Sequence, residues 1–141
     1  MINRLANANI WVKDQNEALR FYTEKLGFEI RTDLTAYDYR WLTVGLKGQP
    51  DIEFHLAPLK PGGTFTEEDV NHLTKLVDAG KLSIGVWKTD DCQKPYETLK
   101  AKGVEFVQPP TDREYGIIEA VFKDNSGNVM VLSQDKQRPP R

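Results

Sequence analysis

Apolar and polar side chains alternate through residues 5–13 and again through residues 39–46. Such alternation is typical of strands that are buried on one face only. A further strand begins between these two at residues 28–30, and residues 51–56 follow as a fourth. Short runs of this kind, separated by turn residues, predict a sheet of four strands in the first half of the chain.

One helix is expected between the first two of these strands. Asp14 and Glu17 form the D-x-x-E pattern of a helix start, in which side chains bond the free N–H groups of the first turn. Gly27 is a typical helix stop, because the left-handed conformation found there strains residues that carry a Cβ atom. The first half of the chain therefore predicts the element order βαβββ.

The second half repeats this order. Asp14 and Gly27 are 13 residues apart, and so are Asp90 and Gly103, which sets the two copies 76 residues apart. A repeat of this length indicates two copies of one supersecondary unit. The elements expected in the second copy are strands at residues 82–88, 104–107, 116–123 and 129–134, and a helix that begins at Asp90 or Asp91, with Pro109 and Pro110 ending the second of these strands.

These patterns predict an α+β fold with a single domain over residues 1–141. Module one covers residues 4–57, a connector covers 58–80, module two covers 81–134 and a tail covers 135–141. The connector is rich in proline and glycine, with a short polar helix near Thr66. Neither module can cover both faces of its sheet alone, because its own helix covers one face only. We therefore expect the modules to form one curved mixed sheet with a concave cup and the helices outside.

Composition and charge argue against several partners. A net charge of −2, with Lys and Arg scattered along the chain, argues against nucleic acid. No apolar run approaches the roughly 20 residues of a membrane span, and the N-terminus lacks the apolar region of a secretion signal. The single cysteine excludes an internal disulfide, so the expected location is the cytoplasm. Cys92 falls in the first turn of the second helix, where the helix dipole lowers a thiol pKa, and it is expected to be structural.

Several motifs together carry a family resemblance. They are V-x-D and FYTEKLGFE in the first module, and TDDC, LKAKGVEF, PP, YG and A-x-F-x-D-x-x-GN-x-x-x-L in the second. With the paired βαβββ order, they resemble the vicinal oxygen chelate superfamily, which includes glyoxalase I, bleomycin-resistance proteins and extradiol dioxygenases. The resemblance covers residues 4–134. It implies a homodimer, since many relatives build the cup or its rim from two chains, but the activity stays open because the superfamily contains both enzymes and binding proteins.

The resemblance also implies where a metal would be held. Metal-using members carry four ligands, usually His, Gln or Glu, on the concave strands, and these positions correspond here to Asn7, Ser83, Glu53 and Val131. Asn and Ser are poor ligands for a divalent metal, and Val has no donor atom. We therefore expect no metal cofactor. The alternative is a divalent metal at a shifted site near Glu53, His55 and Glu119.

Strand periodicity predicts which residues line the cup. The helix-facing set is apolar and includes Val44, Val86 and Leu132, whereas all three tryptophans fall on the cup side. Aromatic planes with a few convergent polar groups suit a small aromatic or cationic molecule. The ligand-binding residues expected are Asn7, Asn9, Trp11, Trp41, Glu53, His55, Ser83, Trp87, Glu119 and Val131.

Three functions are compatible with this pattern. The first is a metal-free protein of the bleomycin-resistance type that binds a small aromatic or cationic molecule. The second is an enzyme, either a lyase or dioxygenase with relocated metal ligands or a metal-free enzyme with Glu53, His55 or Glu119 as base. The third is an interaction module whose cup is filled by side chains and whose sheet edges mediate dimerisation. The tryptophans and the lost ligand positions favour the first, and the identity of the ligand is left open.

Overall fold

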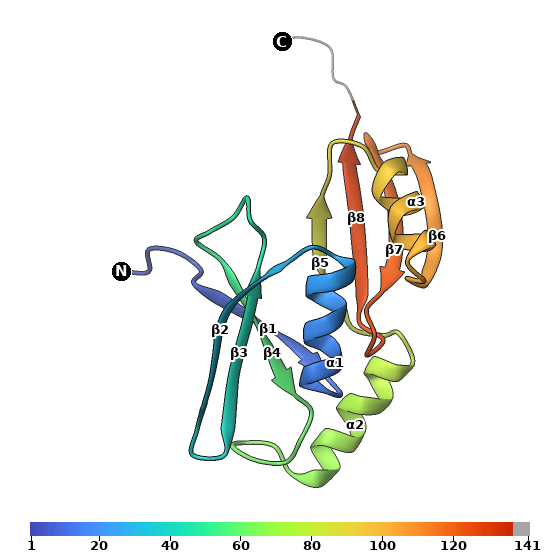
Figure 1. The fold of residues 1–141 in the computed structure, drawn as a ribbon. Helices are drawn as coiled ribbons and strands as arrows, with labels where there is room; N and C mark the ends of the chain where they lie inside the picture. Colours follow the sequence, from blue (N-terminus) through green and yellow to red (C-terminus); the bar gives the residue numbers. More distant parts are fainter. Residues whose placement is uncertain (137–141) are drawn as a thin grey trace. The chain divides into compact units, whose positions relative to one another are not determined.

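The computed structural model of the protein describes residues 1–136 and contains two mixed sheets of four strands each (Figure 1). The chain divides into two compact units, of which the first covers Met1–Leu76 and the second begins at Val77. Each unit holds one sheet, so the predicted α+β fold with two βαβββ modules is confirmed. The cup expected where the two sheets meet, and the single domain built around it, stay predictions.

The sheet of the first unit has the strand order β1-β4-β3-β2. Its strands β1 and β4 run parallel, and the other neighbouring strands run antiparallel. The bounds are β1 Asn7–Val12, α1 Gln15–Arg20, the π-helical turn η1 Phe21–Lys25, β2 Glu29–Ala36, β3 Tyr39–Gly45 and β4 Glu53–Pro58.

The sheet of the second unit has the corresponding order β5-β8-β7-β6, again with its first pair parallel. Its first strand begins at Ser83, 76 residues after Asn7, which confirms the predicted repeat. The bounds of the remaining elements are α2 Glu67–Asp78, β5 Ser83–Lys88, α3 Gln93–Ala101, β6 Phe106–Arg113, β7 Ile117–Lys123 and β8 Val129–Asp135.

The first helix begins and ends where the sequence predicts, but its last turn differs. The Asp14 side chain accepts a hydrogen bond of 2.8 Å from the backbone N–H of Glu17, and Gly27 has a φ of 76°. A π-helical turn replaces the expected regular turn. Its wider turn lets two consecutive aromatic residues, Phe21 and Tyr22, both face the core. The Tyr22 ring then packs edge-on against Phe28 at 5.3 Å.

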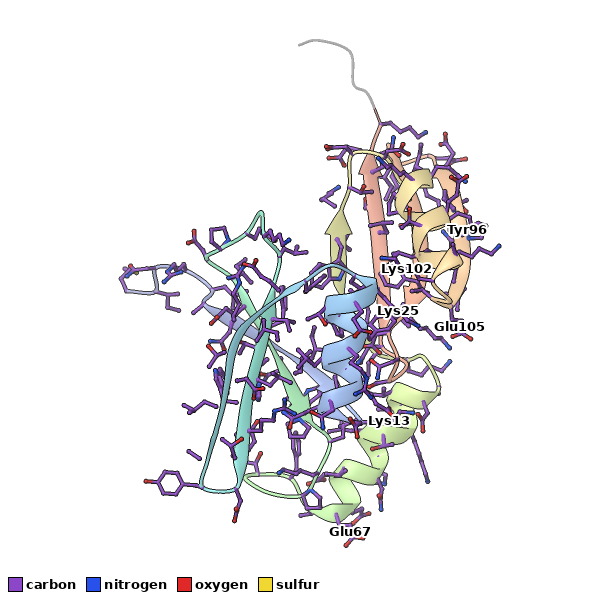
Figure 2. The ribbon with its side chains drawn as sticks, in the orientation of Figure 1. Lys13, Lys25, Glu67, Tyr96, Lys102 and Glu105 are labelled. Carbon is purple, nitrogen blue, oxygen red and sulfur yellow. The ribbon has the colours of Figure 1, made fainter. Side chains whose placement is uncertain are left out.

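Each sheet has one face that packs against its own helix. In the first unit this face is apolar, and its buried residues are Ile10, Val12, Leu42, Val44 and Leu56. Figure 2 labels Tyr96 on α3 of the second unit. Its ring lies edge-on to Phe106 at 4.7 Å, and Phe106 in turn contacts Phe122. Each unit therefore has an apolar core between its own helix and its own sheet.

The prediction that Pro109 and Pro110 end a strand is wrong, because β6 continues through both residues. β6 is an edge strand of its sheet, so one row of its N–H groups has no strand to pair with. Residues without an N–H group are tolerated in that position. The register of β6 against β7 shifts between Phe106 and Gln108 and again before Thr111, which accommodates the proline pair.

The alternation predicted for residues 82–88 is broken at Gly85. This residue has a φ of 103°, and the register of β5 against β8 shifts between Ser83 and Val86. One extra residue in a strand reverses the faces of all residues that follow it. Val86, predicted to face the helix, is therefore 62% exposed, whereas Trp87 pairs with Leu132 on the helix-facing side. The cup-facing orientation predicted for Trp87 is wrong.

The connector contains a longer helix than expected. Thr66 and Asp69 cap the start of α2 reciprocally, since each side chain accepts a hydrogen bond from the backbone N–H of the other. No helix among the described residues is long and apolar enough to cross a membrane. The predicted tail reaches into residues 137–141, which lie outside the described part of the chain.

Candidate ligand-binding site

Six of the predicted site residues share the face of the first sheet that is opposite the α1 side. The parallel strands β1 and β4 pair Asn9 with His55, and β3 adds Thr43 on the other side of His55. Side chains alternate along a strand, so positions two residues apart share this face. The predicted residues that it brings together are Asn7, Asn9, Trp11, Trp41, Glu53 and His55.

His55 lies at the centre of this face and is only 2% exposed. The Trp41 ring stacks on its imidazole, with ring centroids 4.1 Å apart and an interplanar angle of 25°. The Nδ1 atom of His55 lies 3.0 Å from the carbonyl oxygen of Leu42, and its Nε2 atom lies 2.6 Å from the hydroxyl oxygen of Tyr39. Both ring nitrogens therefore have a partner, and the ring is held from three sides.

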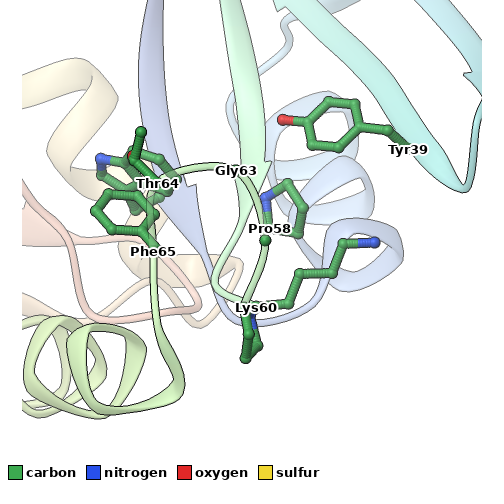
Figure 3. A pocket seen from close by; sticks show the side chains of 9 residues that line it. Tyr39, Pro58, Lys60, Gly63, Thr64 and Phe65 are labelled. Atoms are coloured by element: carbon green, nitrogen blue, oxygen red, sulfur yellow. The ribbon is translucent and has the colours of Figure 1, made fainter.

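A pocket of about 290 Å³ opens next to Tyr39 in the first unit (Figure 3). Trp11 and Phe65 form an aromatic wall, with their rings in edge contact at 5.1 Å between centroids. Tyr39 and Lys60 add polar groups, and the remaining lining comes from Pro58 and residues 61–64. The pocket therefore combines aromatic surface with a hydroxyl and an ammonium group.

A tight turn in the connector brings Phe65 to this wall. The backbones of Gly62 and Phe65 exchange two hydrogen bonds of 3.0 Å each. Gly63 at the tip has a φ of 58°, a left-handed conformation that suits glycine because it lacks a Cβ atom. The glycine pair of the connector thus shapes the pocket, a role that its sequence alone does not reveal.

Lys60 lies on the rim of the pocket. Its Nζ atom donates a hydrogen bond of 3.3 Å to the carbonyl oxygen of Asp38 and lies 5.9 Å from the centre of the Tyr39 ring. Tyr37 and Asp38 form the tip of the β2–β3 hairpin, with φ values of 52° and 61°. Two positive φ angles in a two-residue hairpin loop define a type I′ turn. This turn presents the Asp38 carbonyl oxygen that Lys60 binds.

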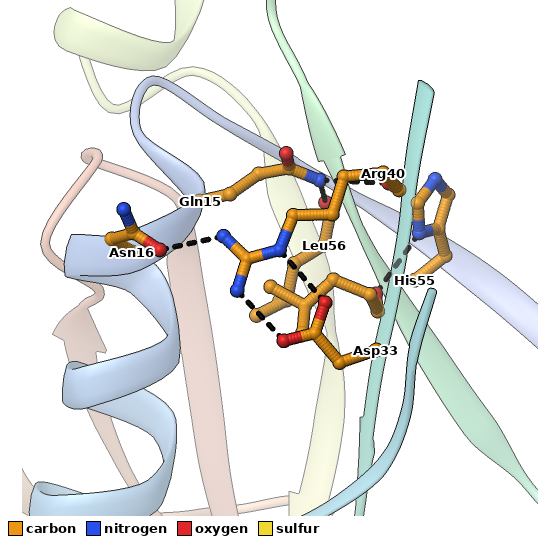
Figure 4. Close-up of polar contacts among 7 residues, drawn as sticks. Gln15, Asn16, Asp33, Arg40, His55 and Leu56 are labelled. Carbon is orange, nitrogen blue, oxygen red and sulfur yellow. Dashed lines mark hydrogen bonds and ion pairs between the residues drawn. The ribbon is translucent and has the colours of Figure 1, made fainter. Parts of the chain in front are cut away.

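Arg40 ties β3 to β2 and to the start of α1 (Figure 4). Its Nε and Nη2 atoms donate to the two carboxylate oxygens of Asp33 at 2.9 Å each, and its Nη1 atom donates to Asn16 at 2.6 Å. The Gln15 side chain donates to the carbonyl oxygens of Arg40 and Leu56 at 3.1 Å and 2.8 Å. These contacts lie on the helix side of β3 and hold the strand whose other face carries the aromatic residues.

In the second unit three predicted residues share the face opposite α3. They are Ser83, Glu119 and Val131, and Val86 joins them in place of Trp87. The Oε1 atom of Glu119 accepts hydrogen bonds of 2.9 Å from Arg113 and from the hydroxyl of Tyr115. The hydrogen bond to Glu119 raises the pKa of Tyr115. Glu119 is therefore already engaged by an ion pair.

The repeat also refines the position that corresponds to Glu53. Asn7 pairs with Glu53 in the first unit, and Ser83 pairs with Val129 in the second. The residue equivalent to Glu53 is thus Val129, two positions before Val131. Val129 and Val131 both lack a donor atom, so neither can act as a metal ligand at this position.

The site residues that the sequence analysis missed are Tyr39, Lys60 and Phe65. Tyr39 precedes Trp41 by two residues, so the strand period already places it on the aromatic face. Lys60 and Phe65 belong to the connector, where no periodicity indicates the direction of a side chain. Only the three-dimensional turn at Gly62 brings them to the pocket.

Comparison with known proteins places the fold in a family. The model of the Glyoxalase/Bleomycin resistance protein/Dioxygenase superfamily matches residues 2–132. The chain belongs to this superfamily. YurT of Bacillus subtilis (strain 168), a relative described as uncharacterized, is 34% identical over 132 residues, which cover 93% of this chain and 98% of YurT.

Two solved structures are similar over nearly the whole chain. UcmS2 has a TM-score of 0.89 and 43% sequence identity, with 96% of this chain and 100% of that chain covered. TnmS3, described as an antibiotic binding protein from Streptomyces sp. CB03234, has a TM-score of 0.74 and 29% identity, with 96% and 98% covered. The superfamily thus includes a neighbour that binds an antibiotic.

The residues of this chain do not fit the metal centre that metal-using members of the superfamily imply. Two of the four corresponding positions carry the weak ligands Asn7 and Ser83, and the last carries a valine. The shifted alternative fits no better, because both nitrogens of His55 have partners and Glu119 is bound by Arg113. Among residues 1–136, no group of three or more His, Cys, Asp or Glu side chains could hold a metal ion.

Cys92 is fully buried directly before α3. Its Sγ atom lies 3.8 Å from the carbonyl oxygen of Leu132. Burial raises the pKa of the thiol, so the lowering expected from the helix dipole is not the effect that prevails. The thiol is therefore held in its neutral form within the packing of α3 against β8.

Proposed function

We propose that this protein binds a small aromatic organic molecule, without a metal ion, at the pocket of the first unit. The observation that carries the proposal is the aromatic wall of Trp11 and Phe65 next to the hydroxyl of Tyr39 and the ammonium group of Lys60. Ligand sites are typically concave and mostly apolar, with a few polar groups that fix orientation. A naphthalene-sized ring system suits a pocket of about 290 Å³.

The family supports the same class of function. TnmS3 is described as an antibiotic binding protein, and its 29% identity over 96% of this chain makes small-molecule binding a reasonable role here. The donors that a metal would need are absent or engaged, which favours binding over metal-assisted chemistry.

The pocket favours an aromatic ligand over a cationic one. Lys60 is the charged side chain of the lining, and its ammonium group repels a cation at close range. Stacking of an aromatic ring on the indole or phenyl face is worth about 0.5–1.5 kcal/mol beyond burial. The aromatic part of the sequence-based expectation is therefore the part that we retain.

The other expectations from the sequence are part of this proposal. We propose a single domain over residues 1–141 that acts in the cytoplasm as a homodimer. Asn7, Asn9, Trp41 and Glu53 would extend the ligand surface beyond the pocket, and Ser83, Glu119 and Val131 stay candidates in the second unit, whereas Trp87 faces the helix side and is no longer one.

The indole N–H signals of the three tryptophans provide a test. ¹⁵N-labelled protein is titrated with 2-naphthol, and each signal is assigned by a Trp→Phe variant. We expect the Trp11 signal to shift in a saturable way, whereas the Trp87 signal stays in place as an internal control. Decahydro-2-naphthol, which keeps the carbon frame and the hydroxyl but lacks the aromatic ring, should bind much more weakly.

A pair of variants makes the test specific. Phe65→Ala removes the part of the aromatic wall beside Trp11 and should weaken 2-naphthol binding by roughly threefold to tenfold, as expected for one aromatic contact. Tyr37→Ala is the matched control, because Tyr37 lies fully exposed at the hairpin tip and does not line the pocket. A Trp11 signal that does not respond, or equal effects of both variants, would contradict the proposal.

A further inference from the structure

The hydrogen-bonding character of the pocket is set by a residue that does not line it. His55 is almost fully buried, and its Nδ1 atom lies 3.0 Å from the carbonyl oxygen of Leu42. A carbonyl oxygen can only accept a hydrogen bond, so the proton of the neutral imidazole resides on Nδ1. The Nε2 atom of the same ring is then an acceptor.

That acceptor orients the hydroxyl of Tyr39. The hydroxyl oxygen lies 2.6 Å from Nε2, so the phenol donates its one proton to His55. Burial raises the pKa of Tyr39, which keeps this proton in place at neutral pH. The oxygen has lone pairs left but no second proton. It therefore offers the pocket an acceptor and no donor.

The hydroxyl end of Tyr39 points toward Pro58 and the turn at Gly63, which also line the pocket (Figure 3). The residue is 42% exposed and belongs to the pocket lining. Lys60 supplies a donor on the same rim, with its ammonium group bound to the carbonyl oxygen of Asp38. A ligand hydroxyl can thus donate to the Tyr39 oxygen and accept from the Lys60 ammonium group. An ether oxygen has no proton to donate, so its lone pairs would face those of the Tyr39 oxygen and repel them.

We propose that the pocket selects aromatic ligands that carry a hydrogen-bond donor, such as a phenolic hydroxyl or an N–H group, through the acceptor oxygen of Tyr39. This inference rests on the proposed aromatic binding and names the class of ligand within it. His55 acts through Tyr39 and is a positioning residue for this selectivity.

The test compares two matched probes by isothermal titration calorimetry. 2-Naphthol and 2-methoxynaphthalene share the ring system and differ by the donor proton. We expect the protein to bind 2-naphthol roughly threefold to tenfold more tightly, which is the effect of one net hydrogen bond. Tyr39→Phe should weaken only 2-naphthol and so remove the preference. A preference that persists in Tyr39→Phe would reflect the size of the methyl group and would overturn the inference.

A second variant tests the role of His55. His55→Phe keeps a ring beneath Trp41 but frees the Tyr39 proton, which can then be donated to an ether oxygen. We expect this variant to bind 2-methoxynaphthalene more tightly than the unaltered protein does. A merely structural role of His55 would weaken both probes alike, and that result would overturn its assignment as a positioning residue.

The outcomes separate the two proposals. Equal affinity of the unaltered protein for both probes overturns the donor preference and leaves aromatic binding intact. Binding of neither probe contradicts aromatic binding itself, and the donor preference with it. Tyr39→Phe keeps the test decisive if His55→Phe disturbs folding, because Tyr39 is partly exposed whereas His55 is buried.

Discussion

The hydroxyl oxygen of Tyr39 on β3 lies 2.6 Å from the Nε2 atom of His55 on β4. The two residues are not directly paired across the strands, because His55 is paired with Thr43, four positions further along β3. Trp41 lies between them in sequence and stacks on the imidazole. The contact joins the wall of the pocket to the buried centre of the aromatic face. We therefore expect a change at His55 to affect a pocket that His55 does not line.

Removal of the Arg40 side chain should destabilise the first unit modestly. Arg40→Ala deletes an ion pair with Asp33 and a hydrogen bond to Asn16. The Asp33 side chain is 40% exposed, so solvent screens the pair and the expected loss in free energy of unfolding is about 1 kcal/mol. Urea unfolding at pH 7, followed by circular dichroism, measures this loss.

The loss in free energy of unfolding caused by Arg40→Ala should depend on pH. The hydrogen bond from Arg40 is the main cause that lowers the pKa of Asp33 below 3.8. A carboxyl group with a lowered pKa in the folded state contributes stability that is present above the unfolded pKa and is lost as the pH falls through the folded pKa. The cost of Arg40→Ala should therefore be smaller at a pH of about 2 than at neutral pH. In an Asp33→Asn background most of this pH dependence should disappear, because only the weaker charge interaction of Arg40 with Asp14 is left. An undiminished pH dependence there would refute this account of the pair.

Two glycines of the second unit should differ in their tolerance of alanine. Gly127 and Gly116 both have positive φ angles, of 116° and 86°. A Cβ atom at Gly127 would collide with the carbonyl oxygen of Val77 at the end of α2, whereas a Cβ atom at Gly116 would meet no atom within 4 Å.

Gly116→Ala should thus cost about 1–2 kcal/mol for backbone strain alone. Gly127→Ala should cost clearly more, because backbone atoms must also shift. Thermal unfolding of both variants, side by side, gives the comparison. Equal losses would mean that the contact between α2 and the β7–β8 turn does not constrain Gly127.

Chelation should leave ligand binding unchanged. Both nitrogens of His55 and one carboxylate oxygen of Glu119 are engaged by protein groups, and Asn7 and Ser83 are weak ligands. Protein purified without a metal-affinity tag should contain far less than one equivalent of Zn, Ni, Fe or Mn by elemental analysis. Dialysis against EDTA should not alter the affinity for 2-naphthol. Near-equimolar metal, or a loss of binding that added metal restores, would show that the site depends on a metal ion.

The strands and the repeat could be predicted because they depend on local patterns. The period of two places Asn9, Trp11, Trp41 and His55 on one face, and the register of the first sheet agrees. The helix start at Asp14 likewise follows from side-chain chemistry within three residues. Features of the structure that depend on such short-range relationships can be predicted from the sequence alone.

The sequence-based predictions are wrong where one extra residue in a strand shifts the alternation of its faces, or where a strand lies at the edge of its sheet. At Gly85 a bulge reverses the direction of Trp87. An isolated glycine within a strand suggests a bulge but does not distinguish it from a close backbone approach, so the pattern alone does not settle the direction of Trp87. At Pro109 the edge position of β6 decides the outcome, and edge positions depend on strand order. The pocket depends on Phe65, which a turn in the connector brings to Trp11.

Intermolecular nuclear Overhauser effects between 2-naphthol and the protein test the central claim most directly. The account predicts contacts from the naphthalene protons to the ring protons of Trp11 and Phe65, and their loss in Phe65→Ala. Contacts only to residues outside the pocket lining, or saturable binding that leaves Trp11 and Phe65 without any contact, would contradict it.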